Sequence, residues 1–315
     1  MFKRGLFMAF VALTSLACSK ENPSEQAPQK KQMATLEVNV SEGVATRATS
    51  VNDANIGTAE RDIQVLVFNG EGNLLAYGAN EEGTTTISMN IPTGTVECYA
   101  VVNSYYDLSV IATKTVFLKR LSHLKDNSTS RMEMLGCISK TIAAGTNSVS
   151  IEVRRFASKV QIDKITPAFA APAHRAMEFK LVGVYLINVN GDCNHLITDK
   201  LSTPVVMQTT AGTVTPYSTP HYLYCYPNPV TTDVSTTTWS ERISRLVIET
   251  TLGGTTYYYS VNIPTPQCNT VYQITNMKIT GLGTDTPDAV VQKGSLSVSL
   301  TVTDWSTGFS KEVEY

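Results

Sequence analysis

Short segments in which apolar and polar residues alternate recur along most of the chain, and they constrain its fold more than any other feature. A period of two residues is typical of a β-strand that buries one face. Segments of this kind, separated by turn residues, lie at 34–40, 62–69, 84–91, 95–103, 148–165, 178–189, 221–229, 245–250, 255–263 and 270–280. Many short strands with turns between them favour β-sandwiches.

One segment departs from this pattern. In TKTVFLKRLSHLKD, residues 113–126, the side chains Phe117, Leu121 and Leu124 recur at a helical spacing, with charged residues on the other side. We expect a short helical interlude there, and a domain boundary near residue 155, where a second run of strands begins. A chain of 315 residues has room for about two domains. The prediction is a mainly all-β fold, with one β-sandwich over 48–155 and a second over 156–315.

The first residues indicate export. Residues 1–17 combine a basic start, MFKR, with the apolar run GLFMAFVALTSLA, which is typical of a signal peptide. Cys18 follows directly and resembles the lipidated cysteine of a bacterial lipobox, although Ser15 stands where leucine is usual. An ordinary signal peptide is the alternative. The polar segment 19–32 reads as a flexible tether, and no later apolar run is long enough to cross a bilayer.

A strand and a candidate protease site follow the tether. Leu36, Val38 and Val40 alternate with polar residues, and Arg47 lies a few residues further on among small and polar residues. The bond between Arg47 and Ala48 therefore suits a protease that cuts after arginine, which would release residues 18–47 as a leader. Arg61 is a competing site, but cutting there would shorten the first strand of the remaining protein.

The end of the chain contains a second strand of the same kind. Leu296, Val298, Leu300 and Val302 lie on one face, and serine and threonine occupy the other. Both this strand and the leader strand present aliphatic side chains at alternate positions, so each could fill the same row of pockets. The C-terminal strand, in about residues 290–315, ends a tail that contains glycine and proline. It need not pair with its own domain.

The sequence offers no catalytic or metal site. The formal net charge is −2 without a basic run, so nucleic-acid binding has no electrostatic basis. GLGTD at 281–285 does not open a helix, which argues against a phosphate site. None of the histidines sits in a metal or nucleophile motif, and the cysteines beyond Cys18 are scattered, as expected of buried thiols rather than zinc ligands. The histidines are His123, His174, His195 and His221, and the cysteines beyond Cys18 are Cys98, Cys137, Cys193, Cys225 and Cys268. We predict no enzyme, no cofactor and no metal.

Aromatic residues leave one alternative of a different class open. Tyr222, Tyr224 and Tyr226 alternate along one segment, and Trp305 follows Asp304 near the end of the chain. Packing is the usual role of such residues, but they can also stack on sugars. A β-sandwich that keeps a lipid on Cys18 and binds glycans with these aromatic residues is therefore a second hypothesis.

Several motifs together resemble the fimbrillin family, the subunits of type V pili. They are the lipobox cysteine, the strand before the TRAT sequence at Arg47, RRFASKVQI, the YPNP turn, NTVYQITNMKITGLGT and the terminal SLTVTDW. The resemblance covers most of the chain, and it implies two transthyretin-like β-sandwiches in tandem.

The resemblance also implies an assembly route. The subunit reaches the outer membrane as a lipoprotein, and an arginine-specific protease then removes the leader strand. This opens a groove, which the C-terminal strand of a neighbouring subunit fills in an extracellular fimbrium that serves adhesion. The implied partners are other copies of the chain, other pilus subunits, the protease and, during export, the membrane. A removable leader and a donor tail favour a shaft subunit over an anchor or a tip subunit.

Overall fold

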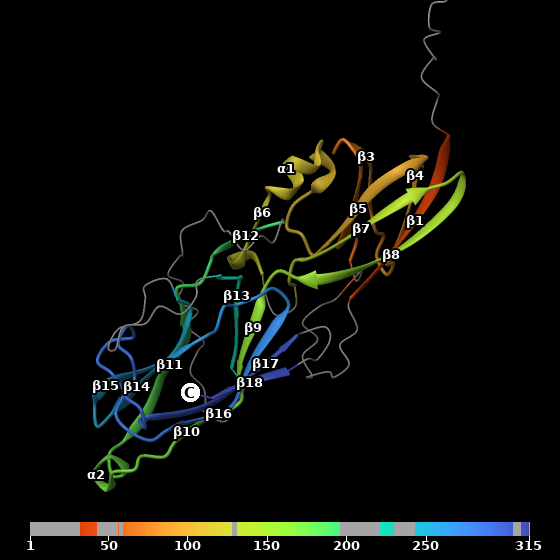
Figure 1. Ribbon diagram of the computed structural model, residues 1–315. Coiled ribbons are helices and arrows are strands. Elements are labelled where there is room, and N and C mark those ends of the chain that lie inside the picture. Colours follow the sequence, from red (N-terminus) through yellow and green to blue (C-terminus); the bar gives the residue numbers. More distant parts are fainter. Residues whose placement is uncertain are drawn as a thin grey trace, which may run out of the picture. The chain divides into compact units, whose positions relative to one another are not determined.

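A sheet of seven strands forms the N-terminal half of the protein (Figure 1). The computed structural model describes residues 32–42, 56, 59–127, 131–195, 221–229, 243–304 and 310–314. Within them the strand order of this sheet is β3-β2-β5-β7-β8-β1-β4. Its strands are β1 Met33–Glu42, β2 Ile63–Asn69, β3 Leu74–Ala79, β4 Thr86–Pro92, β5 Gly94–Val102, β7 Met134–Ile142 and β8 Gly145–Arg155.

The seven strands enclose one apolar core. β1 and β4 pair with each other, and β1 pairs with β8, whereas β2, β3, β5 and β7 pair among themselves. The two groups join where the end of β8 pairs with the start of β7, at Arg155 and Met134. A Cβ atom at Gly136 would lie 2.3 Å from the carbonyl oxygen of Glu152, so the crossing of β7 and β8 requires glycine. The enclosed residues are Ala34, Leu36, Val38, Val40, Ile63, Val65, Val67, Ile87, Met89, Ile91, Val96, Cys98, Ala100, Val102, Met134, Ile142, Val149, Ile151 and Val153.

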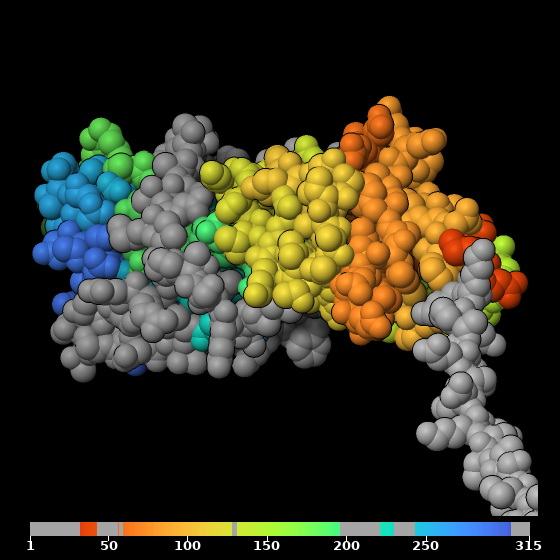
Figure 2. All heavy atoms as spheres, turned by 90° about the horizontal axis from the view of Figure 1, so that it is seen from above, coloured from red at the N-terminus to blue at the C-terminus, as the bar shows by residue number. Residues whose placement is uncertain are grey.

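The helical prediction over 113–126 is wrong beyond Leu118. Helix α1 spans only Lys114–Leu118, and Leu121–His123 form strand β6, which is followed by a 3₁₀ turn at Leu124–Asp126. Strand β6 pairs with β12, Asp192–Asn194, so a tertiary pairing overrides the local helical spacing. Phe117 and Leu124 are buried as predicted, but Leu121 is 37% exposed. This region (yellow) forms a continuous surface beside the strands β2 to β5 (orange) in Figure 2.

Two further sheets form the C-terminal half. The first contains β13 His221–Cys225, β9 Ser158–Ile162, β16 Thr270–Ile279, β17 Leu296–Asp304 and β18 Ser310–Glu314 in this order, with β10 Ile165–Pro167 paired to β16. The second contains β11 Phe179–Ile187, β14 Arg245–Leu252 and β15 Thr255–Asn262. The short helix α2, Pro172–Arg175, precedes β11, and a 3₁₀ turn, Leu108–Val110, precedes α1.

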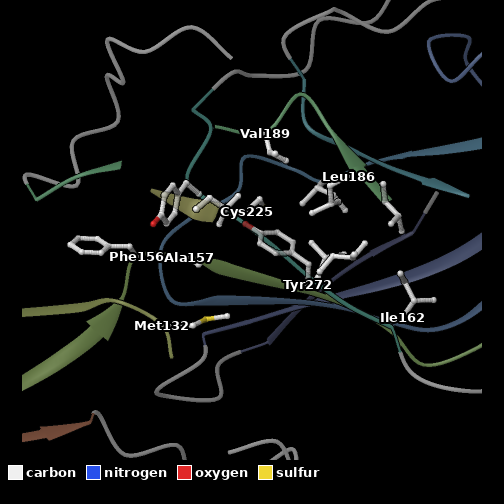
Figure 3. Close-up of a cluster of buried hydrophobic side chains, with 14 of the residues drawn as sticks. Met132, Phe156, Ala157, Ile162, Leu186, Val189, Cys225 and Tyr272 are labelled. Atoms are coloured by element: carbon white, nitrogen blue, oxygen red, sulfur yellow. The ribbon is translucent and has the colours of Figure 1, made fainter. Parts of the chain in front are cut away.

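The two C-terminal sheets share a second apolar core. Leu186 of β11 and Val189, which follows that strand, lie across from Ile162 of β9 and Tyr272 of β16 in Figure 3. The same core includes Phe68 of β2 and also Phe117 and Phe156. Residues on both sides of position 155 therefore share one apolar cluster.

The all-β prediction is confirmed, with two short α-helices among the described residues. The division into two sandwich domains near residue 155 stays a prediction. None of the described helices is long and apolar enough to span a bilayer.

Candidate site around the N-terminal strand

Strand β1 is the second strand from an edge of its sheet, although it is the first strand in the chain (Figure 1). It runs parallel to β8, from Ala34 opposite Gly145 to Glu42 opposite Val153. On its other side it runs antiparallel to β4, from Met33 opposite Pro92 to Asn39 opposite Thr86. Because both of its edges are paired, loss of β1 would leave two rows of unpaired backbone groups, one on β4 and one on β8.

The inward face of β1 fills the middle of the N-terminal core. Leu36 and Val38 are 0% exposed, and Ala34 and Val40 are buried beside them. The predicted alternation of Leu36, Val38 and Val40 is therefore present in the structure. Burial of three such side chains contributes roughly 5–9 kcal/mol before entropy losses.

The outward face of β1 makes weaker contacts. Asn39 accepts a hydrogen bond from Thr86 Oγ1 at 2.7 Å and donates one to Ser148 Oγ at 3.3 Å. Thr35 Oγ1 lies 3.4 Å from Asn90 Oδ1. These side chains are exposed to water, which competes for their hydrogen bonds, so the backbone ladder and the buried row hold the strand.

An ion pair closes the buried row. The inward residues of β8 end in Arg155, whose side chain is 4% exposed, and its Nη2 donates to Oε1 of Glu42, the last residue of β1. The Glu42 side chain is 31% exposed. The backbone N–H of Arg155 also donates to Oδ1 of Asn269, at 3.4 Å, so this arginine joins β1 to the C-terminal half. This ion pair was not predicted, although Arg155 belongs to the segment RRFASKVQI and Glu42 continues the alternation of β1.

The competing arginine is a poor protease site. Arg61 precedes β2 with a φ of 63°, and its backbone N–H donates to the carbonyl of Asn80 at 3.0 Å. Its guanidinium lies 2.9 Å from Asp107 and 3.3 Å from the Tyr77 hydroxyl. Backbone that is held in this way is not available in the extended form that proteases bind. Arg47 and Ala48, and likewise Cys18, lie outside the described residues.

The C-terminal strand pairs with its own sheet, whereas its sequence left it free to pair elsewhere. β17 runs antiparallel to β16, from Leu296 opposite Ile279 to Asp304 opposite Thr270, and β18 covers its other edge. Val298 is 4% exposed and Leu300 is 0% exposed, while Leu296 and Val302 pack against the same core. The predicted apolar face is present, but it fills a place in the C-terminal core.

The aromatic residues of the glycan hypothesis are mostly packed. Tyr226 is buried, its hydroxyl lies 2.6 Å from Ser122 Oγ, and it accepts a hydrogen bond from Asn127 at 2.8 Å. Its burial raises the pKa of Tyr226 well above the usual value. Tyr224 packs against the C-terminal core, and Lys159 Nζ lies 4.7 Å from the ring centre of the half-buried Tyr222. Trp305 lies outside the described residues. Tyr226 is thus a core residue and has no face for a sugar.

Potential metal ligands do not cluster in the described part of the chain. It contains no group of three or more histidine, cysteine or acidic residues that could hold a metal ion. Cys98, Cys193 and Cys225 are buried, as predicted, and burial raises the pKa of Cys98 and Cys225 to about 11. Cys137 is exposed on β7 and Cys268 is partly exposed, so the prediction of buried thiols is wrong for these two cysteines.

The chain matches no family model and no curated protein sequence. Solved structures do resemble it. A fimbrilin of Porphyromonas gingivalis W83 aligns with a TM-score of 0.64 at 17% identity, over 88% of this chain and 98% of that one. A Bacteroides eggerthii DSM 20697 protein, provisionally described as a cell adhesion protein, gives 0.63 at 15% identity over 88% and 98%. The tip fimbrial protein Mfa3 of Porphyromonas gingivalis, with a C-terminal truncation, gives 0.55 at 14% identity over 87% and 100%.

At these identities the likeness concerns the fold. The chain has the fold of fimbrial subunits over nearly the whole length of those structures.

Proposed function

We propose that this protein is a fimbrillin-type pilus subunit that polymerises by strand exchange after its leader strand is cut away. One observation carries the proposal: β1 is paired on both edges and buried on one face, yet only a few residues separate it from Arg47. The fold shared with fimbrial subunits supports it.

The physical consequence of a cut after Arg47 follows from the pairing of β1. Departure of the strand exposes the edges of β4 and β8 and the pockets that Leu36 and Val38 had filled. Such a groove binds an added strand, because main-chain hydrogen bonds provide affinity and alternate side chains fix the register. When the added strand comes from the C-terminal end of a second copy, the contact is head-to-tail. A head-to-tail contact that does not close propagates into a filament.

The route to the cell surface follows from the leader. Cys18 carries a lipid that holds the precursor at the outer membrane, and an arginine-specific protease cuts between Arg47 and Ala48. The subunit then leaves the membrane and joins an extracellular fimbrium that serves adhesion. Its partners are copies of itself and other pilus subunits.

The shaft is the position in the pilus that we favour. A shaft subunit needs both a removable leader and a strand to donate, and this chain has a candidate for each, β1 and β17. The fold does not distinguish a shaft subunit from a tip subunit, because the chain resembles both a fimbrilin and a tip fimbrial protein.

N-terminal sequencing and intact mass of protein sheared from the cell surface test the proposal. An N-terminus at Ala48 in a high-molecular-weight fraction is the expected result. A lipidated N-terminus at Cys18 would instead identify an anchored subunit or a glycan-binding lipoprotein. Deletion of residues 295–315 is a weaker test, because it also removes Val298 and Leu300 from the core of the same chain.

A further inference from the structure

A long loop connects β16 to β17, although the end of β16 lies directly opposite the start of β17. The loop comprises residues 280–295. Its two ends meet, because the backbone N–H groups of Thr280 and Gly281 both donate to the carbonyl of Ser295, at 2.9 Å and 3.0 Å. The loop is therefore closed at its base and extends away from the sheet that contains β16 and β17.

Residues 281–288 of this loop form a strap that is attached to β15, in the other C-terminal sheet. Thr284 and Tyr258 lie in an antiparallel bridge and exchange two backbone hydrogen bonds of 2.9 Å. Thr284 Oγ1 also donates to the Tyr258 carbonyl at 3.1 Å, and Ser260 Oγ donates to the Pro287 carbonyl at 2.6 Å. The strap therefore connects the sheet of β16 to the sheet of β15.

The strap fits closely against β15. A Cβ atom at Gly283 would lie 2.5 Å from the Tyr258 carbonyl oxygen, so this contact requires glycine. Tyr259 is 0% exposed and belongs to the C-terminal core, and its hydroxyl donates to the Gly281 carbonyl at 2.9 Å. The strap is thus joined both to the edge of β15 and to a side chain of the core.

Residues 289–295 connect the strap to β17. Before them, Asp288 at the end of the strap accepts a hydrogen bond from Arg245 of β14. Val291 packs against the C-terminal core, whereas residues 292–294 are exposed. Gly294 has a φ of 90°, and the position of its Cβ is surrounded by open space. A change of backbone direction there meets no steric obstacle.

We propose that the strap stays attached to β15 during strand exchange, and that the chain swings out at residues 289–295 when β17 leaves its own sheet. The inference rests on the strand exchange proposed above. β17 contributes Val298 and Leu300 to the C-terminal core, so its departure weakens the packing between the two C-terminal sheets. The hydrogen bonds of the strap to β14 and β15 do not depend on β17, so they keep the sheets connected. When extended, residues 289–295 reach at most about 25 Å, which limits how far β17 can move.

A disulfide across the strap tests whether it stays closed. Tyr258 and Thr284 lie opposite each other, so Tyr258→Cys and Thr284→Cys can be linked. The test uses the full chain with these two changes and Cys137→Ser, oxidised with copper phenanthroline and then cut by an arginine-specific protease. We expect filament growth within about two-fold of the same chain kept reduced. An oxidised chain that grows only after reductant is added would overturn the proposal.

The matched control locks β17 itself. Lys278→Cys and Ser297→Cys replace exposed residues that lie opposite each other on β16 and β17. With this disulfide closed the cut chain should stay monomeric, and it should grow after reduction. Circular dichroism verifies that each uncut variant folds, and the Cys137→Ser chain without added cysteines measures background linking.

The control also separates this inference from the proposed function. Growth with β17 locked would show that β17 is not the donated strand, which refutes both. If the cut wild-type chain forms no filaments, strand exchange itself is refuted. If the β17 lock blocks growth and the strap lock blocks it too, strand exchange stands and only the fixed strap is overturned.

Hydrogen–deuterium exchange locates the point of release without substitutions. The amides of Tyr258 and Thr284 should be as protected in filaments as in the uncut chain. The amides of Thr280 and Gly281, which close the base of the loop, should exchange about ten-fold faster or more in filaments. Loss of protection at Thr284 would overturn the fixed strap, and unchanged protection at Thr280 and Gly281 would contradict release at residues 289–295.

Discussion

Truncation of Leu36 should loosen the leader without altering the groove that it leaves. Leu36 is 0% exposed and lies opposite Met89 of β4 and Asn147 of β8. A buried Leu→Ala change costs about 2–5 kcal/mol, from lost transfer free energy and the cavity that remains. In the uncut chain this cost lowers the free energy of unfolding. After a cut at Arg47 the leader is a separate peptide, and the same cost lowers its affinity for the rest of the protein.

Affinity changes of this kind act mainly on dissociation. Each 1.4 kcal/mol is a factor of ten, so a cost of about 2–5 kcal/mol for Leu36→Ala should speed release of the cut leader by about 30- to 4,000-fold. Filament growth should start correspondingly sooner after the cut, if departure of the leader limits it. The assay follows the free leader peptide by size-exclusion chromatography with intact mass at set times after cutting.

Thr35→Ala provides the matched control. Thr35 lies on the same strand next to Leu36 but faces outward, where its hydroxyl oxygen lies 3.4 Å from the side-chain oxygen of the exposed Asn90. Its leader should leave within a few-fold of the wild-type rate. Equal release rates for Leu36→Ala, Thr35→Ala and wild type, with all three chains folded, would show that the buried row does not hold the leader.

Three further predictions concern the same part of the molecule. Glu37 of β1 lies opposite Ser88 of β4, so a disulfide between Glu37→Cys and Ser88→Cys should hold the leader strand in place. The cut and oxidised chain should then stay monomeric on size-exclusion chromatography until reductant is added. Filament growth with the disulfide intact would mean that β1 need not leave. Gly136→Ala should lower the free energy of unfolding by about 3 kcal/mol or more in urea denaturation, because its Cβ would lie 2.3 Å from the Glu152 carbonyl oxygen. Stability within about 0.5 kcal/mol of wild type would contradict the close approach of β7 and β8. Lys114→Met should cost about 1 kcal/mol at pH 7, because the hydrogen bond from Lys114 lowers the pKa of Glu97 from its usual value. That contribution is present above the unfolded pKa and is lost as the pH falls through the folded pKa, so urea denaturation should show a smaller difference at pH 3 than at pH 7.

The strand patterns could be predicted from the sequence because their cause is local. Alternate side chains of a strand point to opposite faces, so the spacing of Leu36, Val38 and Val40 indicates a buried face whichever strand pairs with it. The partners could not be predicted in this way. Val38 lies opposite Val149 in the parallel ladder, more than a hundred residues along the chain, and nothing near Val38 specifies that pairing.

The errors have the same origin. Leu121 has helical spacing to Phe117, but residues 121–123 pair with β12, which the local sequence does not reveal. The ion pair of Arg155 with Glu42 was missed because it depends on the parallel register of β1 on β8. The role of the β17 pattern was underdetermined, because an apolar row that suits one core also suits another.

The similarity of the apolar rows of β1 and β17 bears on what drives the proposed strand exchange. Both strands bury an aliphatic row. In β1 the exposed fraction is at most 4% for Ala34, Leu36, Val38 and Val40; in β17 it is at most 4% for Val298 and Leu300, while Leu296 and Val302 are partly buried. Each is also paired on both edges, β1 by β4 and β8, and β17 by β16 and β18. If β17 moves from its own sheet into the groove of a second copy, it therefore keeps an apolar core on one face and a paired strand on each edge. In the exchange proposed above, the balance then depends on loss of the cut leader into solution. That loss would follow only a cut at Arg47, so the proposal makes proteolysis the step that decides when exchange begins.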